Sequence, residues 1–258
     1  LVAVVFCAWG VSSVSVCVCV RVVAVAVFVA PLAAGRCGKC GPVVTLGPAV
    51  VWVIWCVGLS LFCAFVGDVW PALDPWRTIF SGLDALARRM GRAGGIALNW
   101  RWPSALGAWP AVALLLLWSW LEVVHPIAAV PRRLGEAVLI WSAVTLLGMI
   151  GFGREAWQRH ADVFAIYFAT LGRLAALAPA PKGKGIVLRP PGAALIIEST
   201  QIYDKSSPVR PEPVEGLGGF DRLSPNGGVG FVIAVLSTVL FDGLHGGSAW
   251  LLFERWLV

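Results

Sequence analysis

The chain has 258 residues, of which 59% are hydrophobic and only 13% are charged, and its mean hydropathy is +0.83. A water-soluble domain of this length needs far more charged side chains to cover its surface. The composition therefore excludes the ordinary soluble classes and predicts an integral membrane protein whose partner is the lipid bilayer. The net charge of +6 comes from short Arg and Lys clusters between apolar runs, a pattern typical of topology signals, so no nucleic-acid partner is expected.

Residues 1–42 form an N-terminal hydrophobic region in which Arg21 is the first charged side chain. About 20 apolar residues cross a bilayer, so one or two membrane spans fit here. The Cys residues all lie between positions 7 and 63, and Cys37 and Cys40 form a lone C-x-x-C pair. Three interpretations stay open: a metal or redox pair, small buried apolar side chains, or, for residues 14–38, a GC-rich message read in the wrong frame.

Residues 43–181 are predicted to form a transmembrane helix bundle. The clearest span is 43–67, which carries no charge, and further spans are expected at 102–121 and 137–153. A single helix is expected over residues 154–177. It is polar at its start and carries Arg173 near its end, so we expect it to lie half in the membrane interface rather than to span.

An amphipathic helix is predicted directly after the first clear span. Asp74 and Pro75 read as its N-cap and first helical residue. Apolar residues recur at helical spacing on one face from Trp76 to Met90, and Arg side chains occupy the other face. Such a basic helix is expected to lie flat on an anionic leaflet. The five Arg of residues 68–101 place this segment in the cytoplasm, although Arg132 and Arg133 then fall outside, against the positive-inside rule.

The last quarter of the chain divides into two regions. Residues 182–228 are rich in Pro, Gly, Ser and charge, without periodicity, and predict a flexible polar loop. Within that loop, residues 206–227 resemble a peptide encoded by interspersed palindromic repeats of bacterial genomes, which implies an insertion without a selected role. Residues 229–258 are expected to form a C-terminal transmembrane segment, and the chain is expected to be truncated at Val258.

The three His are the leading candidates for chemistry, because each has a carboxylate close by in sequence. Two of them follow an acidic residue by three positions, and such residues share one face of a helix. Two acidic-x-x-His units are similar to the bundle arrangement that binds two metals, so a divalent metal that activates a water is one hypothesis. The alternative is that these side chains meet headgroups and water. The candidate residues are Glu122, His125, His160, Asp162, Asp242 and His245.

A second polar group is expected at the membrane shoulder. Buried charges pair or cost heavily, so a neutral structural cluster is the expectation there. Its members are Asp68, Asp74, Arg77, Arg154 and Glu155. The alternative is a path for protons or cargo, lined by Asp68, Asp74, Arg77 and Glu122.

Seven short motifs occur in one order along the chain: Val51–Trp55, Gly67–Trp70, Asp74–Phe80, Trp109–Ala113, Phe152–Trp157, Phe164–Phe168 and Phe241–Gly243. Together they resemble a group of bacterial multi-pass membrane proteins known as fenitrothion hydrolase. The resemblance runs from about Pro48 to the end, outside the repeat-like insert. It implies the bacterial inner membrane and hydrolysis of organophosphate triesters, and it brings no assigned catalytic residues.

We therefore expect an all-α fold, a polytopic transmembrane helix bundle with an interfacial amphipathic helix. Three functions stay open. The first is an integral membrane protein of unassigned activity, an organophosphate hydrolase by resemblance. The second is a transporter or channel component, and the third is an inactive truncated fragment.

Overall fold

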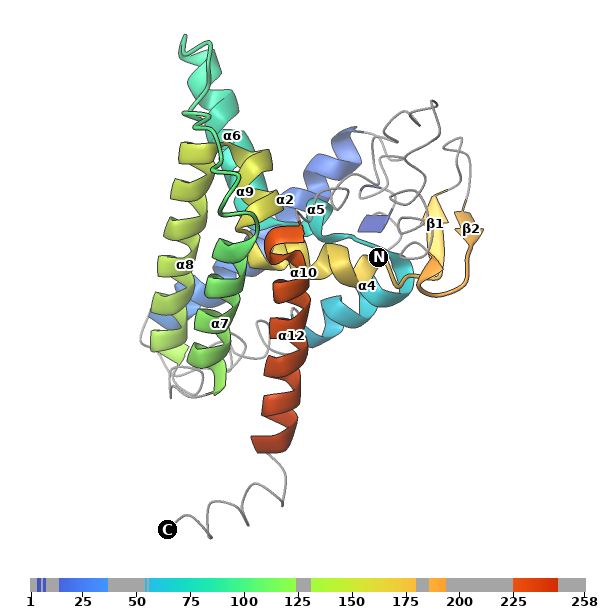
Figure 1. Ribbon diagram of the computed structural model, residues 1–258. Coiled ribbons are helices and arrows are strands. Elements are labelled where there is room, and N and C mark those ends of the chain that lie inside the picture. The colour runs from blue at the N-terminus through green and yellow to red at the C-terminus, as the bar shows by residue number, and fades with distance from the viewer. Residues whose placement is uncertain are drawn as a thin grey trace, which may run out of the picture.

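The computed structural model describes residues 4, 5, 7, 14–36, 54, 56–123, 131–179, 186–193 and 225–245. This part of the chain is mostly helical, which confirms the predicted all-α class (Figure 1). A short antiparallel pair of strands, β1 (Leu177–Pro179) and β2 (Ile186–Leu188), is added to the helices. The described helices are α2 (Val14–Arg36), α4 (Ser60–Val66), α5 (Trp70–Leu73), α6 (Pro75–Arg89), α7 (Trp109–Val123), α8 (Pro131–Phe152), α9 (Arg154–His160), α10 (Val163–Gly172) and α12 (Pro225–His245).

The short helix α10 lies at the centre of this arrangement (Figure 1). It packs against α4, α5, α7 and α9, while α12 packs along α7. Helix α2 contacts α5, α6 and α8. The helices that carry the polar residues therefore meet around the start of α10.

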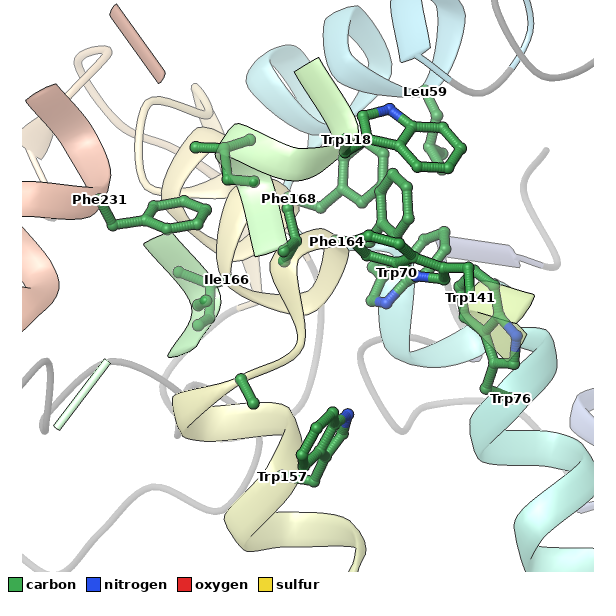
Figure 2. Packing of buried hydrophobic residues seen from close by; sticks show 14 of the residues in the cluster. Leu59, Trp70, Trp76, Trp118, Trp141, Trp157, Phe164, Ile166, Phe168 and Phe231 are labelled. Carbon is green, nitrogen blue, oxygen red and sulfur yellow. The ribbon is translucent and has the colours of Figure 1, made fainter. Parts of the chain in front are cut away.

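The core around α10 is built from aromatic rings (Figure 2). The ring centroids of Trp70 and Phe168 are 4.8 Å apart, and Trp76 stacks on Phe164 at 5.8 Å. The indole N–H of Trp76 donates to Ser142 Oγ at 2.9 Å, which ties α6 to α8. Aromatic pairs in these geometries stabilise a core beyond the area that they bury.

The single helix predicted over residues 154–177 was wrong, because the structure breaks it at Asp162 into α9 and α10. Asp162 adopts an extended backbone conformation with φ −75° and ψ 104°, and its side chain accepts a hydrogen bond from the Ala165 amide. Asp is a poor residue inside a helix and a good one at an N-cap, so a new helix starts here. Arg173 is the C-cap of α10.

Helix α6 starts as the sequence predicts. Asp74 is its N-cap, accepts from the Arg77 amide, and Pro75 is the first helical residue. In the first half of the helix Trp76 and Phe80 are buried where α6 packs against α2 and α8, and the expectation that the helix lies flat on a leaflet stays a prediction. These two aromatic rings belong to the apolar face that the sequence predicts. Towards its end the helix is exposed on its apolar face as well, and Met90 is 79% exposed.

Structure also appears where a loop was expected. Strand β2 and the first turn of α12 both fall within residues 182–228. The strand forms because the apolar residues 186–188 pair with residues 177–179. The repeat-like insert lies outside the described residues, apart from its last three positions in α12. Cys37 and Cys40 also lie outside the described residues. Among the described cysteines, Cys63 is fully buried, as a small apolar side chain would be, whereas Cys7 and Cys17 form a disulfide.

One described helix is long and apolar enough to cross a membrane, over Arg132–Phe152. Shorter apolar helices are found at Val14–Val29, Cys56–Val66, Trp109–Glu122, Val163–Gly172 and Gly227–Leu240. Length and composition of the described segments therefore identify a single candidate span.

Candidate functional site

Two buried aspartates cap neighbouring helices at the centre of the molecule. Asp74 is fully buried and Asp162 is 4% exposed. Asp74 Oδ1 accepts from the Arg77 amide at 3.0 Å, and its Oδ2 accepts from Gln158 Nε2 at 2.6 Å. Asp162 Oδ1 accepts from the Ala165 amide at 3.0 Å, whereas its Oδ2 has no hydrogen-bond partner among the described residues. We call Asp74, Gln158 and Asp162, together with nearby Asp68, the aspartate centre.

Burial weakens the acidity of all three carboxyls, which lie in connections between helices. It raises the pKa of Asp68 to about 7, and the Trp70 amide, which donates to Asp68 Oδ1 at 3.1 Å, lowers it in part. Burial also raises the pKa of Asp74 and of Asp162 above their ordinary value, and the charge of Asp74 raises that of Asp162 further. The negative charge on one carboxylate therefore disfavours ionisation of the other.

Basic side chains lie beside this centre. The guanidinium charge of Arg77 lowers the pKa of Asp68 and of Asp74, opposing the larger effect of burial. Arg154 Nη1 donates to Ser81 Oγ at 3.1 Å, and Arg154 Nη2 lies 3.7 Å from Glu155 Oε1. The arginines therefore contribute charge to the site from α6 and α9, while the closest contacts of Asp74 come from an amide group and a backbone N–H.

An open cleft lies beside the aspartate centre and contains His160. Its volume is about 760 Å³, and its walls come from α6, the segment 94–99 and α9. His160 Nδ1 lies 2.9 Å from the Ala156 carbonyl oxygen. A carbonyl only accepts, so Nδ1 carries the proton in the neutral ring and Nε2 is left as an acceptor. The ring stacks on Trp102, with centroids 5.1 Å apart.

The structure places the described candidate residues in three different surroundings. Glu122 is exposed in the last turn of α7 and lines a groove of about 190 Å³ with Ser119 and Tyr167. His160 lines the cleft, and Asp162 is buried in the aspartate centre. The structure does not bring these three side chains together.

The other candidates fall outside what the structure describes. His125 lies outside the described residues, and Asp242 and His245 belong to the last turns of α12, where side chains are not described. Within the described ranges no group of three or more His, Cys, Asp or Glu side chains is placed to hold a metal ion. The divalent-metal hypothesis therefore stays a prediction about the remaining residues.

Several residues of both sites were missed from the sequence. Gln158, Ser81 and Asn99 carry no motif, and Gln158 contacts Asp74 across 84 positions of chain. A polar side chain in a strongly apolar chain is the signal that could have found them, because a membrane interior tolerates such groups only where they have partners. The sequence does not say which partner each one has.

The chain was compared with protein-family models, curated proteins and solved structures, and no match was found. The resemblance to the fenitrothion hydrolase group therefore depends on the short motifs alone and stays a prediction.

Proposed function

We propose that this protein is a multi-pass integral membrane protein whose aspartate centre binds and releases protons, as a proton-linked transporter or channel component does. The observation that carries the proposal is that the polarity is distributed in the opposite way to that of a water-soluble protein. Large apolar side chains cover the outer faces of the helices, while carboxylates lie inside. On α12 the exposed residues Val229, Ile233, Leu236 and Leu240 follow one helical face, and each is more than half exposed.

Such a surface is unfavourable in water. Each Å² of apolar surface exposed costs about 25 cal/mol, and monomeric soluble proteins rarely expose apolar patches beyond a few hundred Å². The same pattern recurs on α8, where Ile140 and Leu147 are 67% and 66% exposed. On α8 the apolar segment Arg132–Phe152 has 21 residues, and at about 1.5 Å per residue its length matches a hydrocarbon core of about 30 Å. Lipid is the solvent that suits these faces.

The proton-binding role follows from the position of the carboxyls. Ionisable groups in a membrane protein interior are expensive and mark proton or ion pathways. Asp162 is buried with one oxygen that has no partner among the described residues, and burial favours its protonated form. The groove that contains Glu122 is also lined by Val163, the residue next to Asp162, so it approaches the centre from the side of α7, α10 and α12.

The membrane assignment is tested with a pair of lysine substitutions. Leu236→Lys puts a charge on the outer face of α12, where insertion costs about 2.5–3.5 kcal/mol at the centre of a span. We expect the membrane-integrated fraction, measured by alkaline extraction, to fall. Leu86→Lys on α6, at a side chain 54% exposed, is the matched control and should leave the fraction unchanged. A protein that is monodisperse in buffer without detergent would contradict the assignment.

Proton binding is tested in liposomes. Infrared difference spectra across a pH titration are expected to show protonated carboxyls that persist above the ordinary Asp range, and Asp162→Asn should remove the contribution of Asp162 while those of Asp68 and Asp74 remain. Proton flux under an imposed pH gradient should fall in the same variant and persist in Glu155→Gln, whose side chain is 74% exposed. Absence of flux in the wild type, or equal flux in Asp162→Asn, would reject the proposal.

The hydrolase that the resemblance implies is a second candidate, favoured by the acceptor nitrogen of His160 in an open cleft. A neutral imidazole at this position suits a general base for a water, and the Arg154 guanidinium suits the phosphoryl oxygen. The purified protein would be assayed for nitrophenol release from fenitrothion, with and without chelator. Turnover that is absent, or that is equal in His160→Gln, would remove this candidate.

A further inference from the structure

We infer that the cleft between α6 and α9 binds a phosphate-type anion, either the headgroup phosphate of a lipid or a free phosphate group. This site is separate from the aspartate centre, because neither Asp74 nor Asp162 lines the cleft. The inference therefore goes beyond proton binding and does not depend on it.

The charges that line the cleft favour an anion. Arg88, Arg154 and Arg159 contribute three positive charges, against two negative charges from Asp84 and Glu155. The excess positive charge lies on the α9 side of the cleft, because Asp84 on α6 is paired with Arg88 whereas Glu155 on α9 is mostly exposed.

Asp84 is already neutralised inside the cleft. Arg88 Nη2 lies 2.6 Å from Asp84 Oδ2, and the Ile96 amide donates to Asp84 Oδ1 at 2.9 Å. These contacts occupy the Asp84 carboxylate and the Arg88 guanidinium with each other. Arg154 and Arg159 are then the positive groups available to an incoming anion, with Glu155 mostly exposed and 3.7 Å from Arg154.

The Arg154 guanidinium can turn towards an anion while giving up few contacts. It donates from Nη1 to Ser81 Oγ, and the Arg154 side chain is 32% exposed. Its Nε is buried and has no hydrogen-bond partner among the described residues, so turning towards an anion sacrifices no bond at that atom. A guanidinium presents paired N–H groups that match two oxygens of a phosphate.

The wall of the cleft formed by the segment 98–100 is held in place by backbone hydrogen bonds. The amides of Leu98 and Trp100 donate to the carbonyls of Ile150 and Gly151 at 2.7 and 2.9 Å, which fixes the segment 98–100 on the end of α8. Between them Asn99 adopts φ 51°, a left-handed conformation that is uncommon for a residue other than Gly. Asn99 thereby lines the cleft next to Gly153, whose own φ is 85°.

The size and position of the cleft fit this ligand class. A volume of about 760 Å³ lies within the range of small-molecule sites, which is roughly 300–1,000 Å³. Arg88 lines the cleft and is followed in sequence by the exposed Arg89 and Arg92, and basic clusters at a membrane surface attract anionic headgroups. A lipid phosphate and a soluble phosphate offer the same oxygens to the two arginines.

The experiment measures binding to the full chain in detergent, with inorganic phosphate in one arm and solubilised phosphatidic acid in the other. We expect the double variant Arg154→Gln/Arg159→Gln to weaken binding at least tenfold. Arg132→Gln, at an Arg on α8 whose side chain is 80% exposed, is the control and should bind as the wild type does. The single variant Arg159→Gln changes only an exposed residue and should fold normally, with a smaller loss.

The two arms separate the sources of the phosphate. Tight binding in the lipid arm alone identifies a headgroup site, and binding in the phosphate arm identifies a soluble ligand. No saturable binding in either arm overturns the inference, and so does equal binding by the double variant, by Arg159→Gln and by Arg132→Gln. Because the readout is binding, this outcome is independent of whether protons move through the aspartate centre.

Discussion

Gln158 Nε2 donates a hydrogen bond to Asp74 Oδ2 across 2.6 Å and so joins α9 to the start of α6. With the Arg77 amide on Oδ1, both oxygens of the buried Asp74 have a donor. Asp162, by contrast, has a donor on Oδ1 only. This difference stabilises the charged form of Asp74 more than that of Asp162, so Asp162 is the group expected to stay protonated to the higher pH.

Replacing Gln158 by Ala is expected to destabilise the protein. The change leaves Asp74 Oδ2 buried without this donor, and a buried acceptor that loses its partner costs about 1–3 kcal/mol. Unfolding in detergent at pH 7, followed by tryptophan fluorescence, measures the effect. Glu155→Ala on the same helix is the control, because an exposed ion pair contributes only about 0–1 kcal/mol. Equal midpoints for the two variants would show that the Gln158 bond does not support the fold.

Asp68 is expected to make stability depend on pH. Its pKa is about 7 in the folded chain against 3.8 for a free Asp, so the folded state binds more protons between these values. The free energy of unfolding therefore falls as the pH rises from about 4 to 7 and levels off above. The slope contributed by one group stays below about 1.4 kcal/mol per pH unit, and a half-buried carboxyl gives less.

Asp68→Asn tests this dependence. The amide oxygen of Asn can still accept from the Trp70 amide, but it does not titrate. The stability of the variant relative to the wild type should therefore rise with pH across the window, although Asp74 and Asp162 retain a dependence of the same sign. Denaturant unfolding at several pH values measures the difference, with the exposed Glu136→Gln as control. A constant difference between Asp68→Asn and the wild type would contradict the raised pKa.

Ser142→Ala is expected to weaken the contact between α6 and α8. Ser142 Oγ accepts from the buried indole of Trp76 at 2.9 Å, and a net contribution of about 1 kcal/mol is typical of such a bond. Thermal unfolding in detergent should show a lower midpoint, and the fluorescence of the tryptophans should change. Ser237→Ala, at an exposed position of α12, provides a matched serine and should have no effect.

Gly172→Ala is expected to destabilise the packing of α10. A Cβ at this position would lie 2.6 Å from the Asp68 backbone nitrogen, and backbone cannot move aside as a side chain can. Overpacking of this kind costs about 1–3 kcal/mol. Gly82→Ala in α6 meets nothing within 4 Å and should instead stabilise its helix by up to about 1 kcal/mol. Opposite signs in one unfolding assay would support the close approach, and a neutral Gly172→Ala would refute it.

The sequence by itself determined the helical class and the features that depend on neighbouring residues. The Asp74 cap, the proline after it, and the position of Trp76 and Phe80 on one apolar face of α6 all follow from spacing within a few positions. Such features are local, because a cap and a helical face involve residues within about one or two turns of each other. They could be predicted without knowing what packs against them.

Only the tertiary structure decided where the helices break and which polar groups meet. Helical spacing of apolar residues continues through Asp162 and predicts one helix, yet Asp162 caps a new helix, which brings α10 into the aromatic core. The partnership of Asp74 with Gln158, and the cleft that unites α6 with α9, join segments far apart in sequence. Contacts of this kind leave no periodic signal in the chain, since each residue is constrained by a partner that only folding brings near.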